Sequence, residues 1–110
     1  MKPVVFIGGS REELSAFPKS AKLRAGQELF MVQVGRDPED WKPISAVGPG
    51  VREIRVRDEG GAFRVIYTVT FGSAVYVLHA FQKKTRATAR REIELARRRY
   101  KQAAALERNA

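Results

Sequence analysis

The feature that most constrains the fold is period-two alternation of apolar and polar residues between residues 51 and 81. The alternation runs through Val51–Asp58, Ala62–Phe71 and Ala74–Phe81 and predicts three strands. Glycine-containing connections at residues 58–61 and 71–73 join them. Connections this short allow only antiparallel neighbours, so this stretch predicts a three-stranded antiparallel meander.

Before the meander, the chain predicts one strand and two helices. Residues 3–7 are rich in valine and isoleucine and predict a buried strand that ends at a Gly-Gly turn. Ser10 followed by Glu13 predicts a capping box at a helix start. We expect a second helix over about residues 21–34, joined to the first at Pro18 as an antiparallel helical hairpin. The hairpin is expected to bury one apolar stripe: Leu23, Gly26, Phe30 and Val34.

A loop and a final helix complete the predicted fold. Residues 35–50 carry three of the five prolines without any period, which predicts a loop. From about Thr88 helical spacing returns, with Ile93, Ala96, Tyr100 and Ala103 on one stripe. The expected fold class is therefore α+β, with an N-terminal strand, a helical hairpin, the meander and a basic C-terminal helix. A chain of 110 residues is long enough for one core and too short for two, so we expect one domain.

The positive charge is concentrated at the end of the chain. Residues 82–110 hold +7 of the formal net charge of +9. Such a field suits an extended polyanion, either nucleic acid or the ribosome, although an anionic membrane surface would also accept it. The absence of cysteine and the single histidine argue against a disulfide framework and a metal site, so no cofactor or metal is expected. No apolar run resembles a signal peptide or a membrane span, which predicts a cytoplasmic protein.

Basic residues of the meander are expected on one face of the sheet. Arg55 and Arg57 point away from the apolar residues of their strand, and either Arg64 or Tyr67 joins them, depending on the strand register. Lys83 and Lys84 follow just beyond the third strand, so if the three strands are neighbours, Arg55, Arg64 and Lys83 or Lys84 would converge at one end of the sheet. There they could stabilise the negative charge that develops during phosphodiester cleavage. The alternative is structural: the arginines are solvated, and Arg64 is satisfied by an ion pair with Glu53.

Three other side chains of the meander have two interpretations each. His79 is either an acid–base group or a hydrogen-bonded core residue. Tyr67 and Phe81 are either packing residues or platforms on which a base could stack.

Residues 50–85, GVREIRVRDEGGAFRVIYTVTFGSAVYVLHAFQKKT, resemble the phage-related, HigB-like branch of the RelE/ParE toxin superfamily. The pieces EIRVRD, FRVIY and LHAFQKKT carry the resemblance together, and the order of the elements extends it over residues 1–110 as one toxin domain. The resemblance implies a RelE-like fold and the toxin of a type II toxin–antitoxin system. Such a toxin is a metal-independent ribonuclease that cuts mRNA in the ribosomal A site. The implied partners are mRNA, ribosomal RNA and a cognate antitoxin, expected to be a helix-turn-helix protein, with no membrane.

The resemblance also implies roles for single residues. Arg64 matches the arginine of the family's YRxxY strand, and Lys83 matches the basic residue after the last strand. Glu53 stands where some members have lysine, and no tyrosine lies near the start of the last helix, where some members keep a catalytic one. The expected catalytic residues are Arg64, Lys83, Arg55, His79 and Tyr67, and the expected RNA-binding residues are Arg57, Lys84, Arg86 and Phe81.

Two other functions remain open at this point. The ParE branch shares the fold and inhibits gyrase without cutting RNA, so fold alone does not establish ribonuclease activity. The chain could also be an inert phage-derived protein that binds nucleic acid.

Overall fold

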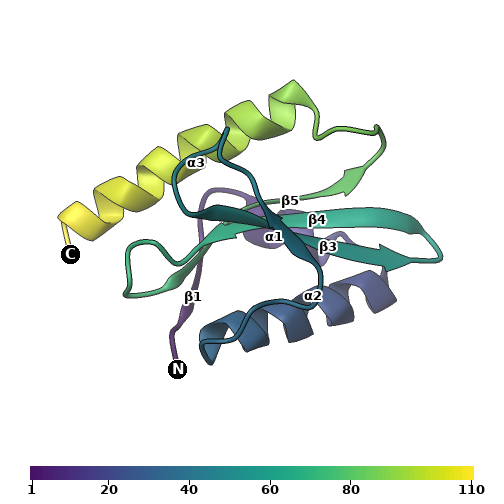
Figure 1. Cartoon of the computed structure of the whole chain (residues 1–110), viewed down its shortest axis with the longest axis horizontal. Helices are drawn as coiled ribbons and strands as arrows, with labels where there is room; N and C mark the ends of the chain where they lie inside the picture. Colours follow the sequence, from purple (N-terminus) through teal and green to yellow (C-terminus); the bar gives the residue numbers. More distant parts are fainter.

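The computed structural model describes residues 1–110 and contains a mixed five-stranded sheet with a long helix on each face (Figure 1). The strand order across the sheet is β1-β5-β4-β3-β2. The strands are β1 (Val4–Phe6), β2 (Trp41–Pro43), β3 (Val51–Asp58), β4 (Gly61–Thr68) and β5 (Val75–Lys83). The helices are α1 (Ser10–Ser15), α2 (Lys19–Gln33) and α3 (Arg90–Arg108). The predicted α+β fold class is confirmed.

The predicted meander is present as β3, β4 and β5, which pair antiparallel in sequence order. The N-terminal strand β1 pairs parallel with β5 at one edge of the sheet. At the other edge the prediction of a continuous loop over residues 35–50 was wrong, because residues 41–43 form β2 and pair with β3. The Arg52 guanidinium lies 3.9 Å from the centre of the Trp41 ring, and this cation–π contact supports the short edge strand.

Helix α2 covers one face of the sheet with a stripe other than the predicted one. Ala21, Ala25, Leu29 and Val32 are buried against the sheet. The predicted stripe of Leu23, Gly26, Phe30 and Val34 instead points outward, and its three large side chains are exposed. Apolar residues occupy two neighbouring stripes of this helix. The sheet takes the stripe that contains two alanines, because small side chains let the helix approach its strands closely.

The predicted capping box at the start of α1 was also wrong. Gly9 is the N-cap residue, and the buried Ser10 hydroxyl donates to the carbonyl of Val77 at 3.0 Å. Glu13 turns away from the helix start and accepts hydrogen bonds from the neighbouring elements described below. The buried hydroxyl needs a partner, and the carbonyl of β5 provides it. The two helices are joined at Pro18, but α1 packs mainly against β5 and not along α2.

Helix α3 covers the opposite face, and its predicted stripe is confirmed. Ala96 and Ala103 are fully buried, with Ile93 and Tyr100 packed beside them. Arg97 donates to the carbonyl of Ala46 at 2.6 Å, so the helix also holds the segment that leads into β3. No helix of the chain is both long enough and apolar enough to span a membrane.

Candidate functional site

The register of the meander brings most of the predicted site residues to one end of the α3 face. Cross-strand partners project from the same face of a sheet, so each set of paired residues forms a row of neighbouring side chains. The structure contains three such rows: Arg57, Ala62 and Lys83; Arg55, Arg64 and Phe81; Glu53, Ile66 and His79. The register therefore places Arg55, Arg57, Arg64 and Lys83 on one face near one end of the sheet.

A β-bulge in β5 helps to determine which side chains share this face. Ile66 pairs with His79 whereas Tyr67 pairs with Val77, so Leu78 has no partner on β4. Arg64 lies directly opposite Arg55, so Arg64, and not Tyr67, shares the face of the sheet with Arg55. Tyr67 lies on the α2 face inside the core, with 1% of its surface exposed, and burial raises the pKa of its hydroxyl. The structure therefore does not bring Tyr67 into the predicted catalytic set.

Arg64 is buried in an ion pair. Its Nε lies 3.5 Å from Oε1 of Glu53, and both side chains are almost completely buried. Its Nη1 donates to the carbonyl of Phe63 at 3.0 Å, and the Thr88 hydroxyl donates to Oε2 of Glu53 at 2.9 Å. Burial lowers the pKa of the Arg64 guanidinium, and the charge of Glu53 opposes that shift. Arg64 is therefore shielded from a ligand by its neighbours, as the structural interpretation of the sequence allowed.

The side chains of Arg55, Arg57 and Lys83 lie around this buried pair on the same face, and we call this part of the sheet the mouth. Arg57 is exposed, and Arg55 and Lys83 are half-buried. Burial lowers the pKa of the Lys83 ammonium, and the positive charge of Arg64 lowers it further. Lys42 of β2, which the sequence analysis missed, pairs with Glu53 and adds another positive charge. The alternation of apolar and polar residues at positions 41–43 was the sequence pattern that could have indicated this strand.

Beside this mouth lies a hollow of about 280 Å³ between the end of β5 and the start of α3. Phe81, Lys83, Lys84 and Arg91 line it, together with Glu92. The half-buried Phe81 ring offers an apolar surface next to three cationic side chains, which suits a nucleotide. Arg86 is exposed in the connection between β5 and α3.

His79 is buried among hydrogen-bonding neighbours that separate it from the mouth. Its Nδ1 lies 2.8 Å from Oε1 of Glu13, and its Nε2 lies 2.7 Å from Oε1 of Glu92. Arg99 donates to the same oxygen of Glu13 at 2.8 Å. The imidazole is 4% exposed and has both nitrogens engaged, so it joins α1, β5 and α3. The local sequence around Glu13 indicates a helix cap and gives no sign of this network, because His79 and Arg99 lie 66 and 86 residues away.

This network predicts acid sensitivity. Burial alone would raise the pKa of Glu13, but hydrogen bonds from Arg99 and His79 outweigh it and lower the pKa below 4.5. A carboxyl group with a lower pKa in the folded state stabilises the fold above its unfolded pKa and loses that contribution as pH falls. We therefore expect Glu13→Gln to be less stable than wild type at pH 7, with a smaller further loss between pH 5 and pH 3. Urea unfolding across this pH range measures both quantities, and parallel pH profiles would contradict the prediction.

Comparison with known proteins agrees with this architecture. The family described as phage derived protein Gp49-like (DUF891) matches residues 12–101. The chain belongs to this family. The solved structure of Escherichia coli toxin RelE in the free state, a mutant with two arginines replaced by alanine, superposes on this Gp49-like protein with a TM-score of 0.64. The two chains share 16% identity, and the match covers 92% of this chain and 96% of the RelE chain. No curated protein matches the sequence.

These findings confirm the resemblance. The chain belongs to a phage-derived family and has the RelE fold, as the resemblance carried by the motifs of β3, β4 and β5 implied.

Proposed function

We propose that this Gp49-like protein is the toxin of a type II toxin–antitoxin system and cuts mRNA on the ribosome, so that translation stops. One observation carries the proposal: Arg55, Arg57 and Lys83 converge at the mouth of the sheet. Guanidinium and ammonium groups gathered at one point stabilise the charge that builds on a phosphate during cleavage. The proposed partners are mRNA, ribosomal RNA and a cognate antitoxin.

In the proposed reaction the 2′-hydroxyl of the RNA attacks the adjacent phosphorus, and the bond from phosphorus to the 5′-oxygen breaks. The 2′-hydroxyl proton passes to water, and the 5′-oxygen gains a proton as it leaves. Arg57, which is exposed, and Arg55, whose side chain is 30% exposed with its Nη1 4.0 Å from Asp40, bind the non-bridging phosphate oxygens. Lys83 gives its proton to the 5′-oxygen. Its lowered pKa makes it a better proton donor than an ordinary lysine.

Arg64 has a different role from the one expected from the sequence. Its guanidinium is buried and paired with Glu53, so we assign it to positioning and not to contact with RNA. It contributes positive potential behind the mouth and helps to lower the pKa of Lys83. The Phe81 ring and Lys84, which line the neighbouring hollow, hold the next nucleotide, and Arg86 contacts the RNA backbone.

The test is controlled expression in a bacterial cell, followed by primer extension across an abundant transcript. Wild type is compared with the double variant Arg55→Ala/Arg57→Ala. The matched control is Arg98→Ala/Lys101→Ala, which removes the same amount of charge from exposed positions of α3. We expect new 5′ ends inside translated regions with wild type and the control, and none with the Arg55/Arg57 variant.

Two outcomes would overturn the proposal. Growth arrest with intact transcripts would indicate a ParE-like inhibitor of gyrase. Neither arrest nor cleavage would indicate an inert protein that binds nucleic acid.

A further inference from the structure

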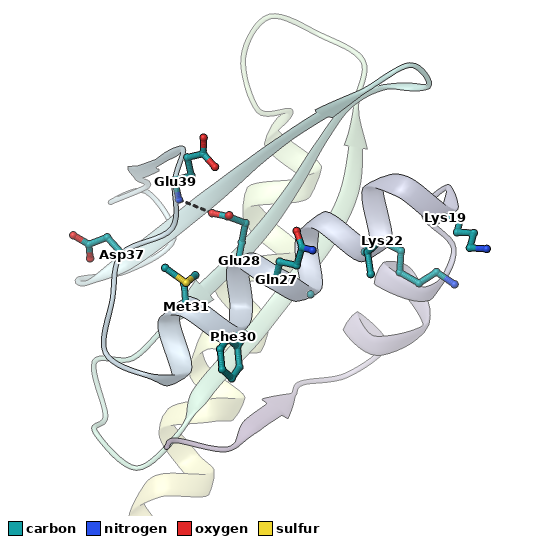
Figure 2. Close-up of a pocket in the computed structure, with 10 residues that line it drawn as sticks. Lys19, Lys22, Gln27, Glu28, Phe30, Met31, Asp37 and Glu39 are labelled. Atoms are coloured by element: carbon teal, nitrogen blue, oxygen red, sulfur yellow. Dashed lines mark hydrogen bonds between the residues drawn. The ribbon is translucent and has the colours of Figure 1, made fainter.

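A large hollow lies along the outward side of α2 (Figure 2). Helix α2 covers the face of the sheet opposite to the face that carries the proposed catalytic mouth. The hollow measures about 1160 Å³. Its floor is the apolar stripe that the sequence analysis expected in the core. Leu23 is 64% exposed and Phe30 is 50% exposed, with the half-buried Met31 beside them. Neighbouring large apolar side chains with this much exposure mark an interaction surface more often than isolated ones do.

Gly26, in the middle of this stripe, gives a second indication. Glycine inside a helix destabilises it by about 0.5–1 kcal/mol relative to alanine. A Cβ atom at Gly26 would meet nothing within 4 Å, so packing inside the chain does not require glycine at this position. On an exposed stripe, a missing side chain lets another helix approach the backbone closely. The stripe therefore suits a helix as its partner.

The charges around the hollow are arranged with opposite signs at its two ends. Lys19 and Lys22 lie at the N-terminal end of α2, and Asp37 and Glu39 lie at the other end (Figure 2). Within the chain Asp37 pairs with Arg52 at 2.8 Å and Glu39 pairs with Arg24 at 3.2 Å. Both carboxylate side chains are still more than half exposed, so each can take a second cationic partner. Glu39 is held there because its backbone N–H donates to the buried carboxylate of Glu28, the hydrogen bond drawn in Figure 2. An antiparallel copy of the same surface would place the basic end of each chain beside the acidic end of the other.

The apolar residues have matching symmetry. Leu23 and Phe30 are about 10 Å apart along the axis, at 1.5 Å per residue, and Gly26 lies near their midpoint. A two-fold axis through this midpoint sets Leu23 of each copy against Phe30 of the other, which is the isologous arrangement of a two-fold dimer. We propose that the outward face of α2 is a homodimer interface, and that its occupant is α2 of a second copy in antiparallel orientation.

The overall charge of +9 does not oppose this arrangement. Residues 82–110, which hold +7 of that charge, belong to the end of β5, the following connection and α3. Helix α3 lies on the other side of the sheet from α2 (Figure 1). In the dimer the two strongly basic helices point outward, and the proposed catalytic mouths stay accessible. A contact made by one helix of each chain is smaller than the roughly 800 Å² per partner of a standard interface, so we expect dissociation at micromolar concentrations.

The first test measures the mass of the full chain by sedimentation equilibrium over a concentration series. We expect a monomer–dimer equilibrium for wild type and at least a tenfold weaker one for Phe30→Asp. The matched control is Leu106→Asp, a similarly exposed apolar position on α3, and its dissociation constant should stay at the wild-type value. A monomer at all concentrations, or a dimer that Phe30→Asp leaves intact, would overturn the proposal.

The second test uses the predicted charge pairing. Lys19→Glu and Asp37→Lys each place like charges together in their own homodimers, so each variant alone should associate more weakly than wild type. An equal mixture restores opposite charges at both ends of the interface and should recover the dimer. Only a two-fold contact between these ends gives recovery in the mixture. Failure to recover, or tight binding of a different amphipathic helix by a chain that remains monomeric, would show that another partner occupies the hollow.

Discussion

Replacing Arg64 with methionine is expected to lower the free energy of unfolding by about 3–5 kcal/mol, because it leaves the carboxylate of Glu53 buried without its cation. Glu53 is fully buried, and the Thr88 hydroxyl is its remaining side-chain hydrogen-bond donor. Adding Glu53→Gln removes the unpaired charge, so the double variant should recover most of the lost stability. Urea unfolding of the wild type, the single variant and the double variant measures both effects.

The control for this prediction is Arg98→Met, which removes an exposed arginine from α3 and should change stability by less than about 0.5 kcal/mol. An Arg64→Met protein as stable as this control would mean that the Glu53–Arg64 pair is not a closed ion pair in solution. A double variant no more stable than Arg64→Met would show that Arg64 acts through its packing and not through its charge.

The second large effect is expected at Lys83. Under the proposed function, Lys83→Ala should slow single-turnover mRNA cleavage on ribosomes by about 10²–10³-fold, because the leaving oxygen loses its proton donor. Stability should change little, since this half-buried side chain lies at the end of β5. The wild-type rate should fall as pH rises through the lowered pKa of Lys83, where the protonated donor disappears.

Lys84→Ala is the matched control for Lys83→Ala, because the neighbouring lysine lines the same hollow but is exposed. We expect it to weaken RNA binding and to leave the rate at saturation close to that of wild type. Equal effects of the two substitutions on the saturated rate would remove Lys83 from proton transfer and leave it with a purely electrostatic role.

Elements with a local signature in the sequence could be predicted from it. The alternation of β3 and β5 and the stripe of α3 gave correct elements, because each pattern is set within one segment. The outward face of α2 was assigned to the core, because the helix has two apolar stripes and only the sheet determines which one is buried. The pairing of β1 with β5 was not predicted, since a three-residue strand carries no information about a distant partner.

In the candidate site, too, residues placed by a local pattern could be predicted, and residues placed by distant contacts could not. Alternation alone placed Arg55 and Arg57 on one face, and the choice between Arg64 and Tyr67 required the strand register. Glu53, the buried partner of Arg64, accepts a hydrogen bond from Thr88, which comes from a later part of the chain. His79 was a candidate proton carrier, but carboxylates from α1 and α3 enclose it, and such distant contacts leave no local pattern.

The hydrogen bond from Arg99 to Glu13 joins residues 86 positions apart and has a consequence for synthesis. At about 5–20 residues per second, the ribosome needs roughly 4–17 seconds to add Arg99 after Glu13. Until residues 75–83 are made, β1 has no β5 beside it and Glu13 lacks His79, and for the whole interval Glu13 lacks Arg99. Folding therefore cannot finish until the last segment is made. Because the contacts that close this network are so distant in sequence, the chain acquires its complete surface only at the end of its own translation.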